Sequence, residues 1–412
     1  MKVCVLTHVY PRFKGDSMPP FIEFICENIQ KQGVDVTVLA PYDISFNRQA
    51  NDHRVKIVLY KYIYPLRLHL LGYSRTMWGD LRLRTIVYFL APFMLFFEIL
   101  AILRLYFKER FDIIHAHWLL PHGFVGAIVS RLLNIPLIIT LHGSGVFLTK
   151  RNLIFREMGR FSVKTAKLVT SVTPEFENYL INNLGLSQAR FRLIVNGVES
   201  LIFESIDKNL VDSIKNKFNI RDKDIIIISI GRLVYKKGFN YLIKAMKLVI
   251  DKYSNVKLII CGEGVLRKEL ELLTKELGIS SYVIFTGSIA HNEVPIYLNI
   301  CHIFVGSFIR DDKGNVDTCP TVILEAMCSG KAVVSTPIGA LPLVLEEGKG
   351  GIFVKERDEK GLAEAINFLI ENPKLREEYG KINKLRVLKN FTWQETVNRY
   401  IEVYYEVLSK NR

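Results

Sequence analysis

Two basic residues in the second half of the sequence could hold a phosphate group. Arg232 and Lys237 lie in the segment "GRLVYKKGFNYLIKA", which follows the apolar run "DIIIISI" and leads into a helical pattern. Gly231 frees the backbone to turn at the end of the predicted strand. Two cations in a loop beside a helix N-terminus favour the binding of a diphosphate. Taken alone, the pattern fits ordinary surface charge equally well.

Two carboxylates flank the start of another predicted helix in the segment "DTCPTVILEAMCSG". Its proline suits the first turn of a helix and its last glycine suits the helix end. Asp317 then lies in the preceding loop, and Glu325 lies among apolar residues in the second turn. Carboxylates accept hydrogen bonds from ribose or hexose hydroxyls, and the backbone amides near Pro320 and Thr321 suit phosphates. Because a buried acid needs a partner, a ligand-facing Glu325 is favoured over a solvated one.

Short Val- and Ile-rich runs alternate with longer helical patterns, which predicts two doubly wound α/β domains. Several runs are apolar on both faces, as parallel strands covered by helices on both sides are. The polar segment 200–223 marks the boundary, so domains are expected at 1–205 and 206–390. A terminal helix at 391–412 could cap the second domain or pack back onto the first. The expected strands are 2–8, 34–39, 55–60, 112–116, 136–142, 168–172, 191–195, 224–230, 256–261, 282–286, 302–306, 332–335 and 351–354.

The cysteine usage favours a reducing compartment. The six cysteines of the 412-residue chain form no CxxC pair and no Cys/His zinc spacing, so they are interpreted as reduced core or site residues. The N-terminal run "MKVCVLTHVY" is too short and lacks a cleavage site, which argues against a signal peptide. A cytoplasmic location is therefore expected.

The positive charge is concentrated in the first half of the chain. Residues 1–200 hold 24 Lys and Arg against 14 Asp and Glu, an excess of +10 out of the net +14. This asymmetry favours an anionic partner, either a phosphorylated acceptor, an anionic membrane surface or nucleic acid, over a merely solubilising charge. Nucleic acid is disfavoured because no recognised binding module is present and the charge lies beside an apolar helix.

Residues 86–103 form the most hydrophobic segment. Its unbroken part ends before Glu98 after twelve residues, short of the roughly 18–20 that a spanning helix needs. A buried helix of the first domain is the preferred interpretation. Basic and aromatic residues precede this segment, so contact of residues 56–107 with an anionic membrane is the alternative.

Three histidines cluster in the segment "HAHWLLPHG". His115 and His117 alternate on a predicted strand and His122 follows, a spacing that could suggest a metal site. No carboxylate lies close in the sequence, so packing at a strand end is favoured and no metal is expected.

Taken together and in order, these motifs resemble the retaining nucleotide-sugar glycosyltransferase family 4, the glycosyl transferases group 1, which have the GT-B fold. The first half contains "YPRFKGD", "DIIHAHWLLPHG", "ITLHGSG" and "VNGVESLIF". The second contains "GRLVYKKG", "CGEG", the Asp317–Glu325 pair and "STPIGALPLVL". Each motif is weak alone, but the ordered set covers nearly the whole chain. The resemblance implies two Rossmann-like domains facing across a cleft, with the acceptor bound by the first and the nucleotide-sugar by the second.

The resemblance also implies roles for residues of the second half. Arg232 and Lys237 match the pair that neutralises the donor diphosphate. Glu325 matches the second Glu of an E-x7-E motif, which holds the ribose. Asp317 stands where the family usually has the first Glu, which contacts the transferred sugar. Aspartate is shorter by one methylene, which puts the depth and hydroxyl pattern of the sugar site in question, although the charge is kept.

Further implied roles fall on both halves. His142 matches a histidine that closes on the transferred sugar, and Gly262 in "CGEG" is expected to form a tight turn beside the nucleotide. Gly15 and Asp16 belong to a cleft loop after the first strand, which lacks the Gly-Gly pair common in relatives.

The function implied is that of a retaining, metal-independent hexosyltransferase without a cofactor. It would move a sugar from a nucleotide diphosphate sugar to an acceptor, with the leaving phosphate taking the acceptor proton on the same face. The basic first half suggests a lipid-linked or phosphate-bearing acceptor on the cytoplasmic face of a membrane, as in surface polysaccharide or glycolipid synthesis.

Two alternatives on the same fold remain. A nucleotide-sugar epimerase would act without an acceptor, and the ordered transferase motifs argue against it. A non-catalytic sugar-nucleotide-binding subunit of a polysaccharide assembly complex is supported by the departure at Asp317. The intact Arg232, Lys237 and Glu325 oppose that second alternative.

Overall fold

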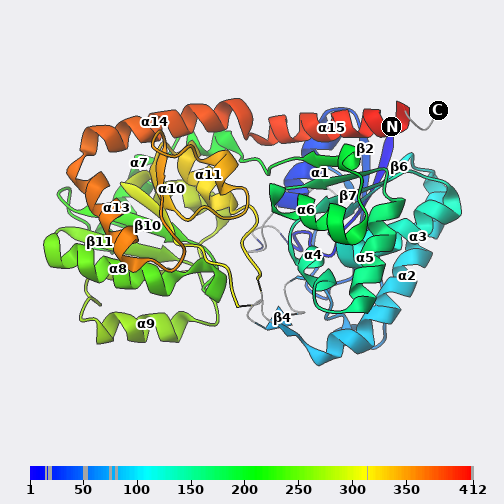
Figure 1. Ribbon diagram of the computed structural model, residues 1–412, viewed down its shortest axis with the longest axis horizontal. Helices are drawn as coiled ribbons and strands as arrows, with labels where there is room; N and C mark the ends of the chain where they lie inside the picture. Colours follow the sequence, from blue (N-terminus) through cyan, green and yellow to red (C-terminus); the bar gives the residue numbers. More distant parts are fainter. Residues whose placement is uncertain are drawn as a thin grey trace. The chain divides into compact units, whose positions relative to one another are not determined.

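The chain folds into two compact units (Figure 1). The computed structural model describes residues 1–13, 16, 21–49, 54–73, 77–78, 82–312 and 314–409, and at 77–78 and 82–83 only the backbone. Unit 1 comprises Met1–Asn196 with Trp393–Arg412, and unit 2 comprises Gly197–Thr392. The polar segment 200–223, which marked the boundary in the sequence, lies entirely within unit 2.

Unit 1 is built on a seven-stranded parallel sheet in the order β3-β2-β1-β6-β7-β8-β9. The strand order reverses between β1 and β6, so the carboxyl ends of these two strands form a topological switch point. A short antiparallel pair, β4 and β5, was not expected. The strands are β1 (Lys2–Leu6), β2 (Asp35–Pro41), β3 (Lys56–Tyr60), β4 (Met77–Trp78), β5 (Arg82–Leu83), β6 (Ile113–His117), β7 (Leu137–Leu141), β8 (Leu168–Ser171) and β9 (Phe191–Leu193).

Helices cover both faces of this sheet because successive strand residues point to opposite sides. Val3 and Val5 of β1 share a core with the C-terminal helix, whereas Gly126 of α3 approaches Leu6 and Ile114 on the other face. The helices of unit 1 are α1 (Phe21–Lys31), α2 (Thr85–Glu109), α3 (Phe124–Leu133), α4 (Ser144–Thr149), α5 (Leu153–Thr165), α6 (Glu177–Tyr179) and α15 (Trp393–Ser409).

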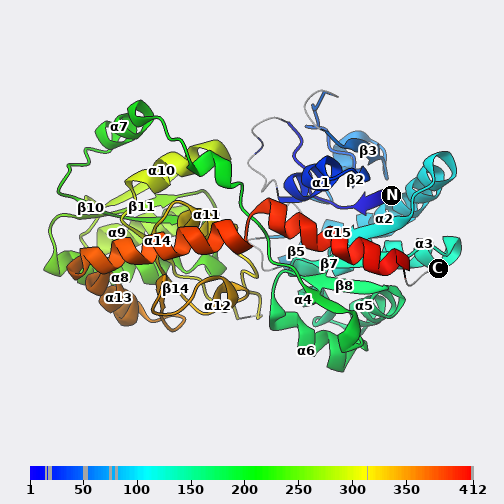
Figure 2. The same ribbon diagram turned by 90° about the horizontal axis from the view of Figure 1, so that it is seen from above.

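The C-terminal helix α15 lies beside α1 (Figure 2). Its buried residues recur every three or four positions, the spacing of one helix face, at Trp393, Val397, Tyr400, Tyr404 and Val407. They join the core formed by α1 and the strands of unit 1. The C-terminal helix therefore packs back onto the first domain and does not cap the second.

Helix α2 corrects the sequence interpretation of a buried helix. It runs through 25 residues, long and apolar enough to cross a membrane, yet only 22% of its most apolar window is buried. A stripe of residues at every third or fourth position packs inward, namely Leu90, Met94, Glu98, Ile102 and Leu105. A helix on the outside of a sheet is covered on one side only, so the aromatic residues of the opposite side remain exposed. Glu98 interrupts the apolar sequence but not the helix, and its side chain belongs to the buried stripe.

Unit 2 contains a six-stranded parallel sheet in the order β12-β11-β10-β13-β14-β15. Its strand order reverses between β10 and β13, which is its own switch point. The two parallel sheets confirm the predicted pair of doubly wound α/β domains. The strands are β10 (Ile225–Ile230), β11 (Val256–Cys261), β12 (Val283–Gly287), β13 (Ile303–Gly306), β14 (Ala332–Ser335) and β15 (Gly351–Phe353).

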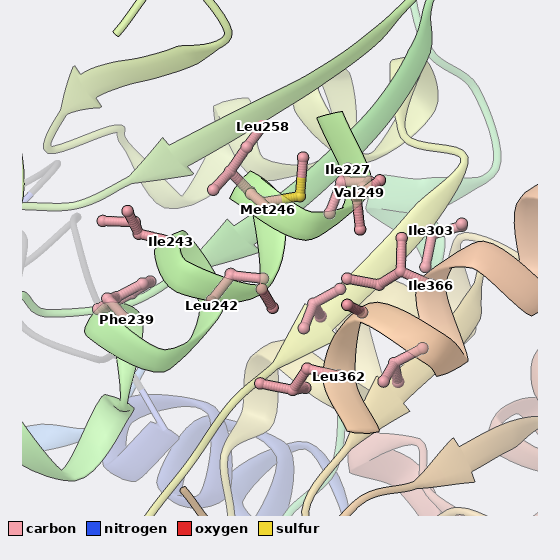
Figure 3. Close-up of a cluster of buried hydrophobic side chains, with 14 of the residues drawn as sticks. Ile227, Phe239, Leu242, Ile243, Met246, Val249, Leu258, Ile303, Leu362 and Ile366 are labelled. Carbon is pink, nitrogen blue, oxygen red and sulfur yellow. The ribbon is translucent and has the colours of Figure 1, made fainter. Parts of the chain in front are cut away.

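The core of unit 2 lies where α8 and α13 cover one face of this sheet (Figure 3). Phe239, Leu242, Met246 and Val249 recur along one side of α8 and are buried against Ile227 of β10. The core thereby fixes the end of β10 and the start of α8, between which the basic loop lies. The helices are α7 (Lys208–Lys217), α8 (Phe239–Lys252), α9 (Arg267–Glu276), α10 (Val294–Ile300), α11 (Thr321–Cys328), α12 (Leu341–Val344), α13 (Glu359–Glu371) and α14 (Pro373–Asn390).

The packing of α15 on the sheet includes one buried polar contact that can be tested. The Tyr404 hydroxyl lies 2.7 Å from His115 Nδ1, and His115 Nε2 lies 2.7 Å from the Thr140 hydroxyl. Desolvation lowers the pKa of His115 to about 3. The ring is therefore neutral at physiological pH and needs a partner at both nitrogens.

Replacing Tyr404 by Phe removes the partner of His115 Nδ1 and leaves a buried nitrogen unsatisfied. We expect the free energy of unfolding to fall by about 1–3 kcal/mol, measured by urea denaturation. Tyr405→Phe is the matched control. That side chain is 62% exposed, so the loss of its hydroxyl group should not change the free energy of unfolding measurably. Equal stabilities of the two variants would contradict this account of α15.

Candidate active site

The predicted basic loop and the predicted acidic loop of unit 2 follow neighbouring strands. Arg232 and Lys237 come after β10, and Asp317 comes after β13. These strands pair in parallel across the switch point of the sheet. Since the carboxyl ends of parallel strands share one edge, the two loops meet there, at the place where open α/β sheets bind ligands.

Lys237 and Asp317 form an ion pair at this edge. Lys237 Nζ lies 2.6 Å from Asp317 Oδ2, and the two side chains are 11% and 20% exposed. The ammonium group also lies 4.9 Å from the centre of the Phe308 ring, a distance suited to a cation–π contact. Both groups are thus held in position before any ligand arrives.

The charge state of Asp317 follows from its neighbours. Burial alone would raise the pKa of this carboxyl group, but Lys237, Lys236 and Arg232 outweigh burial and lower the pKa to about 2. Asp317 is therefore an anion throughout the physiological range. Arg232 itself is exposed and acts on Asp317 through its charge.

Two glycines let the backbone approach itself closely beside this pair. A Cβ atom on Gly262 would lie 2.0 Å from the carbonyl oxygen of Gly231, which no real structure tolerates. A Cβ on Gly231 would lie 3.0 Å from Lys237 Cε. Both positions therefore require glycine, and the Lys237 side chain lies over the place where a side chain on Gly231 would be.

Helix α11 begins directly behind the acidic loop. Pro320 is the residue before its first turn, not within it, and Thr321 is its first residue. Pro320, the N-cap residue, makes no side-chain capping bond, and the backbone amides of a helix N-terminus suit an anion. The loop is held from behind, since the Ala340 amide donates to the Thr318 carbonyl at 2.8 Å.

Glu325 is buried in α11, as its apolar neighbours predicted, and has a partner that the sequence did not reveal. His291, in the short turn His291–Glu293 after β12, places Nε2 3.2 Å from Glu325 Oε1. Burial opposes protonation of His291, but the hydrogen bond and charge of Glu325, with Glu199, raise its pKa above the usual value. The two residues are 34 positions apart, so no local motif could have linked them.

His142 lies just after β7 in unit 1, within a cluster of rings. Its Nε2 lies 2.8 Å from His117 Nδ1, and its ring contacts Phe21 and Trp118 at centroid distances of 4.9 and 4.8 Å. Desolvation, with His115, lowers the pKa of His142 to about 3. His142 is therefore a neutral hydrogen-bonding group and not a cation.

The predicted cleft loop is only partly described. Gly15 lies outside the described residues. The Asp16 carboxylate accepts hydrogen bonds from Arg12 Nε and Nη2 at 2.8 and 2.9 Å. This bidentate pair joins Asp16 to Arg12, four positions earlier in the chain.

The histidines of the segment "HAHWLLPHG" each contact another side chain of the protein. His115 bonds to Tyr404 and Thr140, and His117 bonds to His142. Within the part of the chain that the structure describes, no group of three or more His, Cys, Asp or Glu side chains is placed to hold a metal ion. Sequence reasoning took Glu98 only as the end of an apolar run and missed that its side chain contacts His122 of this region.

Two doubly wound units, one with a cation–carboxylate pair at its switch point, define an α/β protein of the GT-B type. The solved structure of Anabaena Alr3699/HepE in complex with UDP has this fold, with a TM-score of 0.77, 18% identity, and coverage of 98% of this chain and 100% of that one. Sucrose-phosphate synthase from Thermosynechococcus elongatus matches with a TM-score of 0.79, 19% identity and coverage of 99% of both chains.

The chain belongs to the GT4-type glycosyltransferases. The family model described as Glycosyltransferase Family 4 matches residues 21–200, and that described as Glycosyl transferases group 1 matches residues 211–386. A glycosyltransferase of Methanocaldococcus jannaschii is 28% identical over 301 residues, which are 73% of this chain and 77% of that protein. The N-acetyl-alpha-D-glucosaminyl L-malate synthase of Bacillus anthracis is 22% identical over 307 residues, covering 74% and 77%.

The ion pair of Asp317 predicts a pH dependence of stability. The folded-state pKa, about 2, lies below the ordinary value of 3.8, so the stabilisation is complete above about pH 5 and is lost as the pH falls toward 2. The shift corresponds to about 2 kcal/mol. We expect the free energy of unfolding of the wild type to exceed that of Asp317→Asn by this amount at pH 6. The difference should shrink steadily in denaturant titrations at lower pH, and a constant difference would exclude the ion pair as its source.

Proposed function

We propose that this glycosyltransferase moves a hexose-type sugar from a nucleotide diphosphate sugar to an acceptor, with retention of configuration and without a metal ion. The observation that carries the proposal is the pairing of Lys237 with Asp317 beside Arg232 at the switch point of unit 2. Such a pair can contact one donor at two points. The cation suits a phosphate group, and the carboxylate suits a sugar hydroxyl.

The remaining groups of this edge match the other parts of such a donor. The uncapped N-terminus of α11 at Thr321 suits the diphosphate. Glu325, oriented by His291, suits the two ribose hydroxyls. Gly231 and Gly262 let the loops after β10 and β11 pack closely against each other beside this edge. The solved structures of Anabaena HepE contain UDP and UDP-glucose, which supports a nucleotide-sugar donor for this chain as well.

The charges of the site suit cleavage of the bond between the anomeric carbon and the phosphate. Negative charge grows on the diphosphate as this bond breaks, and preorganised Lys237, Arg232 and the α11 amides stabilise it. Positive charge grows on the sugar ring, which an anionic Asp317 favours. Asp317 is engaged by Lys237 at 2.6 Å, which suits it to orienting the sugar and not to attacking it. Departure and attack on the same face follow, with retention.

We further propose that unit 1 contacts the cytoplasmic face of an anionic membrane through α2. Six aromatic side chains of this helix are 37–70% exposed, namely Tyr88, Phe89, Phe93, Phe96, Phe97 and Phe107. Exposed cations on or beside the same helix accompany them, namely Arg84, Arg104 and Lys108. Aromatic residues beside cations suit the boundary of an anionic bilayer. A peripheral enzyme there would reach a lipid-linked or phosphate-bearing acceptor, as in surface polysaccharide or glycolipid synthesis.

The donor site predicts a specific loss of binding and turnover in Lys237→Ala. UDP-, GDP- and ADP-glucose are to be tested without added metal, and a donor that binds only the folded protein raises its melting temperature. We expect one donor to do so, and Lys237→Ala to abolish the shift and to lower donor turnover about 10²- to 10³-fold. Lys244→Ala, an exposed lysine of α8, is the matched control and should behave as the wild type.

The outcomes separate the alternatives. Conversion of the donor alone into an isomer would identify an epimerase, and binding without turnover would identify a non-catalytic subunit. Proton NMR of the transfer product reads its anomeric configuration, so an inverted product would overturn retention. A shift that requires a divalent metal would overturn metal independence.

The proposed membrane contact predicts flotation with anionic vesicles. The wild type should float with phosphatidylglycerol vesicles, and more weakly at high salt, because the flanking cations are screened. The double variant Phe93→Ser, Phe96→Ser should bind roughly tenfold to a hundredfold more weakly, from the apolar area withheld from the bilayer. Leu385→Ser, at an exposed residue of α14, is the control. Wild-type protein that stays at the bottom of the gradient would exclude the contact.

A further inference from the structure

The loop that carries Asp317 is tied at its start to the basic loop of unit 2. Ser307, the first residue after β13, donates its hydroxyl hydrogen to the Gly238 carbonyl oxygen at 3.0 Å. The Ile309 amide donates to the Lys236 carbonyl oxygen at 3.0 Å. These bonds fix the beginning of the loop, but the chain continues for several residues before it reaches Asp317. The position of Asp317 therefore depends on what holds the middle of the loop.

The middle of the loop is a short closed turn. The Asp311 carboxylate accepts hydrogen bonds from the backbone amide and from Nδ2 of Asn315, each at 2.8 Å. The Asp311 amide in turn donates to the Asn315 carbonyl oxygen at 3.0 Å. Both side chains are buried, and buried polar groups that are hydrogen-bonded to each other make a segment rigid. Asp317 follows directly behind this stiff turn, so whatever holds the turn also holds Asp317.

Two consecutive residues after β15 hold the turn at Arg310. Glu356 Oε2 accepts a hydrogen bond from the Arg310 backbone amide at 2.5 Å, and Arg357 Nη2 donates to the Arg310 carbonyl oxygen at 2.9 Å. Arg357 also lies 3.3 Å from Asp312 Oδ1, but these side chains are 47% and 96% exposed, so that pair contributes little. The two bonds to the backbone of Arg310 form a clamp between the loop after β15 and the loop of Asp317.

The clamp requires an unfavourable backbone conformation. Arg357 has a φ of +64°, in the left-handed region that residues with a Cβ atom seldom adopt. Such strain persists only where the surroundings hold it in place, and it is frequent at functional sites. In this turn the strained residue is the one whose side chain reaches the Arg310 carbonyl oxygen.

The clamp reaches further than closing the sheet demands. Strand β14 lies between β13 and β15 in the sheet, so the clamp crosses over the end of β14 to reach the switch-point loop. The pairing of β14 with β15 already secures the outer strand. Glu347 makes a similar carboxylate–amide bond at the same strand, accepting from the Phe353 amide at 3.1 Å, without contacting the loop of Asp317.

We propose that Glu356 and Arg357 are positioning residues of the transfer reaction, which clamp Arg310 and thereby hold Asp317 beside Lys237 for contact with the transferred sugar. This inference rests on the proposed role of Asp317. An aspartate side chain is short, so a displaced backbone carries its carboxylate away from the sugar. Glu356 and Arg357 act through Arg310, and all four residues belong to unit 2.

The strength of the ion pair between Lys237 and Asp317 tests the clamp without any substrate. Glu356→Ala leaves the Arg310 amide without its acceptor, so the loop of Asp317 loosens and the pair weakens. The pKa of Asp317 should then rise from about 2 toward its ordinary value of 3.8. At pH 6, adding Asp317→Asn to Glu356→Ala should lower the free energy of unfolding by about half or less of what it does in the wild type. An equal loss in both backgrounds would overturn the clamp.

Arg357→Gly separates positioning from stability because it affects the two differently. Glycine adopts the left-handed backbone without strain, so the melting temperature should stay the same or rise. The Arg310 carbonyl loses its donor, so kcat should fall about 10- to 10²-fold, as a displacement of about 1 Å at a reacting group can cause. A variant with the wild-type kcat, or one that loses melting temperature and kcat together, would overturn the positioning role of Arg357.

Variants of Glu356 separate the hydrogen bond from the charge. Turnover is measured with whichever of UDP-, GDP- and ADP-glucose raises the melting temperature of the wild type. Glu356→Ala should lower kcat about 10- to 10²-fold and leave KM nearly unchanged, because Arg232 and Glu325 still hold the nucleotide. Glu356→Gln keeps an oxygen that accepts from the Arg310 amide, so it should retain the wild-type kcat. Glu347→Ala is the matched control and should lower only the melting temperature.

The remaining outcomes are equally decisive. A loss of kcat in Glu356→Gln as large as in Glu356→Ala would show that charge and not the hydrogen bond matters, which would overturn the clamp. The same loss in Glu347→Ala would assign Glu356 to sheet stability alone. A wild type that neither binds nor turns over any nucleotide sugar would instead contradict the proposed function, while the ion-pair measurement would still judge the clamp.

Discussion

The ion pair between Lys237 and Asp317 is the contact on which the candidate site depends. It joins the loops after β10 and β13 across the strand-order reversal, and Lys237 helps to lower the pKa of Asp317. Its geometry needs a glycine at 231, because Lys237 occupies the space of the missing side chain. It also needs the loop of Asp317 to be held from behind, as the bond between Ala340 and Thr318 does. The site is thus preorganised, which is the condition for electrostatic stabilisation of a developing diphosphate charge.

Unit 1 uses the same sheet edge with different chemistry. Unit 2 gathers cations and carboxylates at its switch point, whereas unit 1 gathers neutral rings, His8, Trp118, His117 and His142. Desolvation lowers the pKa of His8, His117 and His142, so these imidazoles stay neutral and serve as hydrogen-bonding groups. Behind these rings, the side chain of Glu98 is buried 2.6 Å from His122 Nδ1.

Helix α2 combines two roles that its composition alone could not separate. Its outward side exposes aromatic residues that a soluble protein rarely gathers, while its inward stripe carries a carboxylate. Counting the apolar run only up to Glu98 made the segment too short to span a membrane and favoured a buried helix. The tertiary structure shows that Glu98 belongs to the inner stripe, so the apolar outer side continues past it without interruption.

The sequence by itself determined the class of fold and the family, and it predicted which second-half residues gather at one edge of a sheet. Strand periodicity and the fixed spacing of Arg232, Lys237, Asp317 and Glu325 are local properties, and parallel strands bring their carboxyl ends together in any doubly wound sheet. Only the tertiary structure decided which distant groups pair, such as His291 with Glu325, Tyr404 with His115, and Glu98 with His122 and His8. These contacts join residues far apart in the chain, and which face of α2 is buried depends on packing against a sheet. Neither hydrophobic spacing nor residue type encodes such a partner, because burial and pairing are properties of the folded neighbourhood.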